Sequence, residues 1–103
     1  MNKILSIIIP TYNMERYLEK CLSSLIIDGL ERVEVIVVND GSKDRSLDIA
    51  QSFASKYPKS FVIIDKDNGN YGSCINAGLY KATGKYVKVL DAENAYTVVT
   101  ESD

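Results

Sequence analysis

Four apolar segments alternate along the chain with segments whose apolar residues recur every three or four positions. The apolar segments are ILSIII at 4–9, VEVIVV at 33–38, FVIID at 61–65 and KYVKVL at 85–90. Near-continuous apolar runs of this length are typical of strands buried on both faces of a parallel sheet. The pattern therefore predicts four strands separated by helices.

The first two intervening segments have the periodicity of amphipathic helices. Apolar positions at 17–26 follow Asn13, which we expect to cap the first helix. A second stripe at 47–57 follows Ser42, the expected cap of the second helix, and Pro58 comes just after its end.

The third intervening segment predicts a helix over 72–83, with Gly84 as its stop signal. Its periodicity indicates an inward face of Ile75, Leu79 and Ala82. After Asn94 the pattern decays, which predicts a short extended piece and no complete fifth strand–helix unit.

Alternating strands and helices predict an α/β fold, with three α/β/α layers around a mainly parallel sheet of about four strands. Ligands of such sheets bind beyond the carboxyl ends of the strands. Those ends here read PTYN, NDGS, DKDNG and DAEN. All four are polar, and because they meet at one edge of the sheet, we expect a binding site there.

Composition narrows the class of protein only a little. The chain has 103 residues, of which 46% are hydrophobic and 25% charged. These are ordinary values for one globular domain, and we expect residues 1–103 to form a single domain. The net charge of −2 lacks the basic excess typical of nucleic-acid binding, so no nucleic-acid partner is expected.

The chain contains no histidine, which excludes Ser-His-Asp and Cys-His nucleophilic sites. Cys21 and Cys74 lie within apolar, helix-like patterns and indicate buried reduced thiols rather than a disulfide. The N-terminal apolar run ends at Pro10 without a cleavage pattern, so it predicts a core strand rather than a signal peptide. No segment approaches transmembrane length. We therefore expect a cytoplasmic protein.

The last predicted strand runs directly into two carboxylates, Asp91 and Glu93. On an extended segment these side chains point the same way, about 6–7 Å apart, and would repel each other without a cation between them. They therefore indicate a hard-metal site, although an acidic turn that closes the strand would give the same residues.

The other polar turns allow both structural and binding interpretations. The NDGS turn could be a tight turn with a cap, or Asp40 could accept hydrogen bonds from a base or sugar while Gly41 allows close approach. Tyr12 offers a flat face for a base. The glycines of DNGNYG precede a helix, where backbone amides can meet phosphate. Neither GxGxxG nor GxxxxGK[ST] follows the first strand, which disfavours a dinucleotide fold or a P-loop.

Taken in order, three stretches of this sequence resemble the family 2 glycosyltransferases of the GT-A fold. They are SIIIPTYNMERYLEKCLSSL, VEVIVVNDGSKDRSLDIA and NGNYGSCINAGLYKATGKYVKVLDAEN, and the similarity covers about residues 4–96. The resemblance implies a Rossmann-like, nucleotide-binding half of a transferase. It also implies a nucleoside-diphosphate sugar as donor, with a UDP-sugar favoured, and a divalent Mn or Mg ion.

The resemblance also assigns residues. It implies that Asp91 and Glu93 hold the metal, with Glu93 in place of the usual aspartate. Ile75 stands where many members carry arginine, which implies either that no cation faces the phosphates or that Lys66 serves instead. The implied substrate-binding residues are Pro10, Thr11, Tyr12, Glu15, Asp40, Gly41, Ser42, Lys66, Asn68, Gly69, Asn76 and Asp91.

Members of the family continue beyond the metal motif with an acceptor-binding half that carries the catalytic base for inverting transfer. Glu101 and Asp103 match no family motif, so we expect no catalytic residue here and a chain truncated after the metal motif, inactive alone. Membrane association would come only from the missing part. A homodimer through an exposed sheet or helix surface is also expected. The alternatives are a non-catalytic nucleotide-binding or interaction module and, less favoured, a nucleotidyltransferase.

Overall fold

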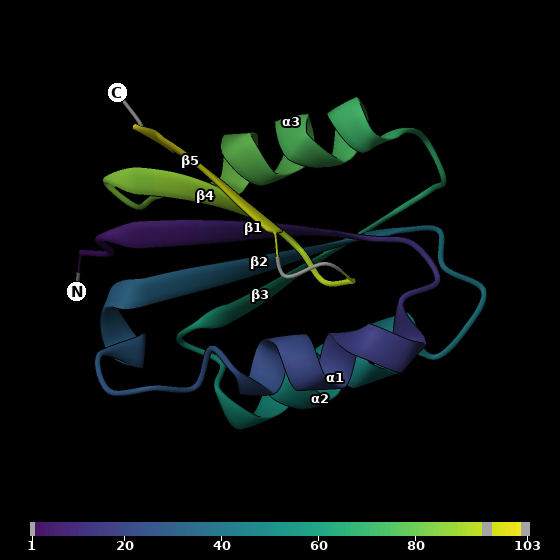
Figure 1. Ribbon diagram of the computed structural model, residues 1–103, viewed down its shortest axis with the longest axis horizontal. Coiled ribbons are helices and arrows are strands. Elements are labelled where there is room, and N and C mark those ends of the chain that lie inside the picture. The colour runs from purple at the N-terminus through teal and green to yellow at the C-terminus, as the bar shows by residue number, and fades with distance from the viewer. Residues whose placement is uncertain (1, 94–95, 102–103) are drawn as a thin grey trace.

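The computed structural model describes residues 2–93 and 96–101. Within them the strands form one five-stranded sheet, in the order β3-β2-β1-β4-β5. The strands are β1 (Leu5–Thr11), β2 (Val33–Asp40), β3 (Phe61–Lys66), β4 (Tyr86–Asp91) and β5 (Tyr96–Glu101). Figure 1 shows β1 to β4 running the same way, with β5 returning along the outer edge of β4.

The first four strands pair in parallel, as predicted. β5 pairs antiparallel with β4, from Asp91 opposite Tyr96 to Tyr86 opposite Glu101. The short extended piece expected after Asn94 is therefore a fifth strand of the sheet. The prediction of a mainly parallel sheet of about four strands is confirmed, and β5 adds one antiparallel strand to it.

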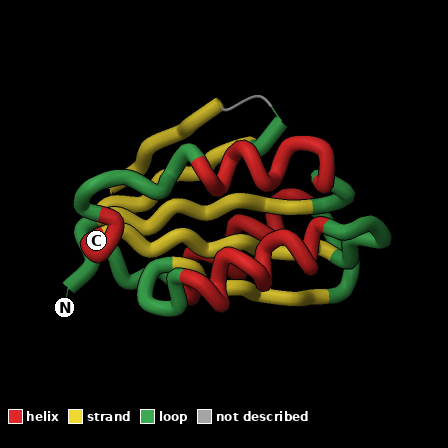
Figure 2. Tube along the Cα trace, turned by 90° about the horizontal axis from the view of Figure 1, so that it is seen from below, coloured by secondary structure: helices red, strands yellow, loops and turns green. Residues whose placement is uncertain are grey.

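Three helices cover the sheet from both sides. They are α1 (Glu15–Ser23), α2 (Ser46–Lys56) and α3 (Tyr71–Lys81), and a 3-10 turn spans Leu30–Arg32. α3 lies on one face and α1 with α2 on the other (Figure 1). Figure 2, seen from the side of α1 and α2, shows these helices lying over the strands. The predicted three-layer architecture is confirmed. None of the helices in the described part of the chain is long and apolar enough to cross a bilayer.

Each face of the sheet has its own apolar core. Ile7, Ile9 and Val35 pack with α1 and α2 on one side, while Ile8 and Ile36 pack with α3 on the other. Because successive side chains of a strand alternate between faces, a continuous apolar run fills both cores at once. The central strands are consequently almost fully buried, and they fix the positions of the loops that follow them.

The predicted caps of the first two helices are wrong. Neither Asn13 nor Ser42 occupies the position before the first helical residue. Asp44 takes the capping role instead, because its Oδ2 accepts from the Glu15 N–H at 3.1 Å and its Oδ1 from the Ser46 N–H at 2.9 Å. One carboxylate therefore satisfies a free amide at the start of both α1 and α2.

Asn13 and Ser42 join the two loops in which they lie. The Asn13 N–H donates to Ser42 Oγ at 3.0 Å, and Asn13 Oδ1 accepts from the Lys43 N–H at 2.8 Å. Ser46 Oγ accepts from the Met14 N–H at 2.8 Å. The loop after β1 and the loop after β2 are thus held together by side chain–backbone hydrogen bonds.

α3 begins one residue earlier than predicted, because Asn70 and Ser73 form a reciprocal capping box. The predicted inward residue Leu79 is 46% exposed, so that part of the prediction is wrong. Gly78 takes the inward position, where an added Cβ would lie 2.6 Å from Cγ2 of Ile8. The helix approaches the sheet closely there because no side chain separates them.

Candidate functional site

A cleft of about 410 Å³ opens at the carboxyl ends of β1, β2 and β4, beside the start of α3. The chain runs outward from β1 to β3 and then returns to β4 on the other side of β1, so the strand order reverses at this point. Crevices at such reversals are the usual ligand sites of open α/β sheets. The lining residues are Pro10, Thr11, Tyr12, Met14, Asp40, Asn68, Gly69, Asn70, Tyr71, Cys74 and Asp91.

The structure brings together part of the residue set predicted from sequence. Around the cleft it places Pro10, Thr11, Tyr12, Asp40, Asn68, Gly69 and Asp91. The predicted residues that do not line it are Glu15, Gly41, Ser42, Lys66, Asn76 and Glu93. Sequence reasoning did not assign Met14, Asn70, Tyr71 and Cys74. The Asn-x-x-Ser pattern of a capping box marks the start of α3, and it could have placed the last three of these beside the loop.

Asp40 is the most buried carboxylate at the cleft, with 6% of its surface exposed. Its Oδ1 accepts hydrogen bonds from Lys66 Nζ at 2.7 Å and from the Gly69 N–H at 2.9 Å. The hydrogen bond from Lys66 lowers the pKa of Asp40, against the opposing effect of burial and with help from Gly69 and Cys74. Asp40 is therefore an ionised, acceptor-only group at the floor of the cleft.

Lys66 lies beside Asp40 and outside the lining of the cleft. Besides Asp40 Oδ1, its ammonium group donates to the backbone oxygen of Asp67 at 2.9 Å and to Ser73 Oγ at 3.1 Å. The hydrogen bond to Asp40 raises the pKa of Lys66. Lys66 therefore links the end of β2 to the loop after β3 and to the start of α3.

Gly41 follows Asp40 in the chain and lies outside the lining of the cleft. Its φ is +73°, and an added Cβ would lie 2.8 Å from the backbone nitrogen of Asn68. Asn68 uses this proximity to donate from Nδ2 to the backbone oxygen of Asp40 at 2.9 Å. A side chain at position 41 would separate the two loops, so glycine is required for both conformation and space.

Two tyrosines lie at the mouth of the cleft. Tyr12 follows β1 and is 44% exposed, and Tyr71 begins α3 and is 61% exposed. Aromatic rings that stay open to solvent next to a polar floor offer flat surfaces on which a base can stack. Tyr12 was assigned from the sequence, whereas Tyr71 was not.

The geometry of the DAE segment differs from the prediction. β4 ends at Asp91, and the chain then turns, with the Glu93 N–H donating to Asp91 Oδ1 at 2.9 Å. Asp91 and Glu93 therefore do not lie on one continuous extended segment, contrary to the prediction. Asp91 lines the cleft, whereas Glu93 lines a neighbouring cavity. Among the side chains that the structure describes, no cluster of three or more His, Cys, Asp or Glu residues is placed to hold a metal ion.

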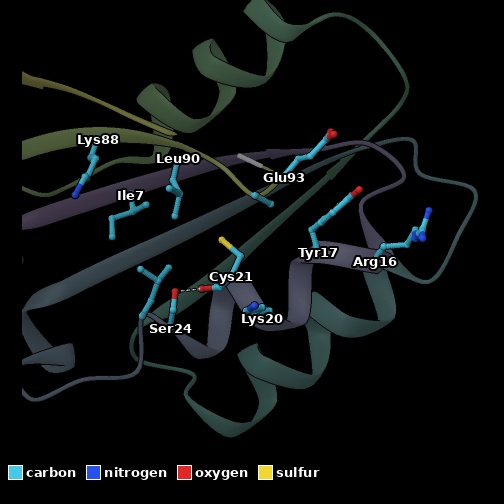
Figure 3. A pocket seen from close by; sticks show the side chains of 11 residues that line it. Ile7, Arg16, Tyr17, Lys20, Cys21, Ser24, Lys88, Leu90 and Glu93 are labelled. Carbon is cyan, nitrogen blue, oxygen red and sulfur yellow. Dashed lines mark hydrogen bonds between the residues drawn. The ribbon is translucent and has the colours of Figure 1, made fainter. Parts of the chain in front are cut away.

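That neighbouring cavity, of about 460 Å³, lies between α1 and the face of strands β1 and β4. Its floor is apolar, from Ile7 and Leu90, and Cys21 also lines it, where burial raises the pKa of the thiol. Figure 3 shows the Glu93 side chain extending from the turn after β4 in the same direction as Tyr17 of α1. Cys21 is thus only partly buried, unlike Cys74, and both are free cysteines.

Residues 6–98 match the family described as Glycosyl transferase family 2. The chain belongs to this family, which confirms the resemblance given by its polar turns. The match includes β1 and β4 and the loops around the cleft.

Among individual proteins, the chain is 41% identical over 91 residues to the minor teichoic acid biosynthesis protein GgaB of Bacillus subtilis. A crystal structure of S. aureus TarS in complex with UDP superposes with a TM-score of 0.74 at 30% identity over 87% of this chain. The Pyrobaculum calidifontis mannosyltransferase PcManGT, in complex with GDP-Man and Mn²⁺, shares the fold with a TM-score of 0.75 at 24% identity over 90% of this chain.

The matched region is a small part of each of these proteins. The chain covers 10% of GgaB and 27% and 28% of the TarS and PcManGT chains in those structures. It therefore corresponds to one segment of each of these longer proteins.

Proposed function

We propose that the cleft binds the nucleoside diphosphate part of a sugar donor, with a UDP-sugar favoured. The observation that carries the proposal is the buried, ionised carboxylate of Asp40 on its floor. An acceptor-only group pairs with the N3–H of uracil, whereas the unprotonated N3 of cytosine would face it with a lone pair. One of the structures that this chain resembles is that of TarS in complex with UDP.

The residues around Asp40 suit the other parts of a nucleotide. Tyr12 supplies a stacking surface, and Thr11 and Asn68 supply polar edges at the cleft. Gly69 allows the backbone to approach the ligand. Of the other predicted contacts, Glu15, Ser42 and Asn76 do not line the cleft, so direct contact by them would require the ligand to extend beyond it.

We propose that a Mn or Mg ion binds with the donor at Asp91. Asp91 lines the cleft, and these cations are usually held by one or two carboxylates together with water and substrate phosphates. Glu93 is exposed in the adjoining turn and would contribute the second carboxylate. When bound, such a cation stabilises the negative charge that develops on a leaving diphosphate.

For the whole protein we propose inverting transfer of the sugar to an acceptor hydroxyl. In this chain the described residues would bind and orient the donor, and we assign the catalytic base to none of them. A second candidate, a non-catalytic nucleotide-binding module, uses the same cleft. It is favoured by the separation of Glu93 from the cleft that Asp91 lines.

Titration calorimetry of UDP, with and without Mn²⁺, tests the binding proposal. We expect binding to the unmodified chain, stronger with Mn²⁺, and at least a tenfold loss for Asp40→Asn, because hydrogen bonds to charged groups contribute about 1.5–3 kcal/mol. The control is Asp48→Asn, an exposed position on α2 outside the cleft, which should leave the affinity unchanged. UDP and CDP binding equally well, or no effect of Asp40→Asn, would contradict the proposal.

A further inference from the structure

We infer that Lys66 is a positioning residue that fixes the Asp40 carboxylate and the 67–70 loop for base recognition, and that it does not contact the phosphates. This inference rests on the proposed nucleotide site. It reassigns the one lysine that the sequence offered as a replacement for the missing arginine at Ile75.

The position of Lys66 follows from the sheet. Lys66 is directly opposite Asp40 in the parallel pairing of β3 with β2. Opposite residues on neighbouring strands project to the same face, so the two side chains start next to each other. The ammonium therefore reaches Asp40 Oδ1 at 2.7 Å from within the sheet rather than across the cleft.

The hydrogen-bonding capacity of Lys66 is already used. An ammonium group has three N–H donors, and Lys66 Nζ contacts three acceptors, on Asp40, Asp67 and Ser73. A phosphate could be bound only by breaking one of these bonds. Asp40 lines the cleft, and Asp67 and Ser73 are the chain neighbours of the lining residues Asn68 and Cys74. The lysine is therefore placed to hold these segments together.

The same network sets the shape of the loop. The Gly69 N–H donates to the Asp40 oxygen that Lys66 also contacts. An added Cβ at Gly69 would lie 2.7 Å from Ser73 Oγ and 3.0 Å from Lys66 Nζ. A side chain at position 69 would therefore displace Ser73 Oγ and Lys66 Nζ from their present hydrogen bonds.

These contacts determine which oxygen of the Asp40 carboxylate is available to a ligand. Lys66 and Gly69 both contact Oδ1, which holds the carboxylate in one orientation. A carboxylate has about four lone-pair sites, so Oδ2 retains capacity for a ligand N–H. Without Lys66 the carboxylate would rotate and the loop would lose its anchor.

A comparison of two ligands separates the two roles of Lys66. Titrations of uridine and of UDP are made with the unmodified chain, Lys66→Met and the control Lys81→Met, an exposed lysine at the end of α3. If Lys66 acts through Asp40, both ligands should lose affinity by the same factor, about tenfold, because the base contact is common to both. A loss for UDP without a loss for uridine, or no loss for either, would overturn the inference.

Two further measurements test the positioning role of Lys66. Ser73→Ala removes one hydrogen-bond partner of Lys66 without removing the charge of the lysine. It should lower the affinity for uridine and for UDP by the same factor, and by less than Lys66→Met does. Hydrogen exchange of the Gly69 amide, measured without ligand, should accelerate about tenfold in Lys66→Met. An unchanged exchange rate would refute the positioning role, whereas failure of the unmodified chain to bind either ligand would refute the proposed function alone.

Discussion

The backbone N–H of Glu93 donates a hydrogen bond to Oδ1 of Asp91 at 2.9 Å. This bond closes a turn directly after β4 and occupies one lone pair of the Asp91 carboxylate. It leaves Asp91 at the cleft and carries Glu93 toward the cavity beside α1. The two acidic residues of the DAE segment are therefore not equivalent.

The first prediction follows from this difference. Asp91→Asn should remove most of the Mn²⁺-dependent part of UDP binding, because it removes the charged ligand that lines the cleft. Glu93→Gln should reduce that part by a smaller factor. Calorimetry of both variants at two Mn²⁺ concentrations measures the effects. A larger loss for Glu93→Gln than for Asp91→Asn would contradict the assignment.

Asp44→Ala should destabilise the fold by about 1–2 kcal/mol, because the two helix starts that share this carboxylate would each lose an acceptor. Burial alone would raise the pKa of Asp44, but hydrogen bonds from Ser46 and Glu15 lower it overall. The stabilisation is thus present above the unfolded pKa, near 3.9, and is lost as pH falls through the folded value. Urea unfolding of Asp44→Ala and of the exposed control Asp28→Ala, at neutral and acidic pH, measures both effects.

The pair of Asp40 and Lys66 should show a pH dependence of its own. The pKa of Asp40 is lowered in the folded state, so its contribution is present above the unfolded pKa and is lost as pH falls through the folded value. The difference in unfolding free energy between the unmodified chain and Lys66→Met should therefore shrink as pH falls below about 4. Urea unfolding from pH 7 to pH 3 measures this, with Lys81→Met as control. A difference that stays constant across this range would refute it.

Two glycines of α3 provide a matched pair for the packing of the helix on the sheet. Gly78→Ala should cost about 1–3 kcal/mol, because its Cβ would meet the buried Ile8 at 2.6 Å and overpack the core. At Gly72 the nearest atom to an added Cβ is 3.4 Å away, so Gly72→Ala should be neutral or stabilising, as helix propensity favours alanine. Thermal unfolding of the two variants compares them directly. Equal melting temperatures would contradict the close packing.

The architecture was predictable because the runs of β1 and β2 are almost entirely apolar, and a parallel sheet covered on both faces buries them. The caps were not predictable, since Asn13 and Ser42 are good capping residues by type. The choice of Asp44 depends on the contact between two loops 29 residues apart in the chain. The alternation argument at Asp91 and Glu93 failed because a single hydrogen bond ends the strand between them.

The loops after β1 and β2 share four side chain–backbone hydrogen bonds, made by Asn13, Ser42, Asp44 and Ser46. Each loop therefore supplies partners that the other needs. In a chimaera with a relative, exchanging PTYNME alone would replace Asn13, the acceptor of the Lys43 N–H. Exchanging NDGSKDRS alone would replace the three side chains that accept from the backbone amides of residues 13–15. Donor preference in such chimaeras is consequently expected to transfer only when both stretches are exchanged together, as one inherited unit.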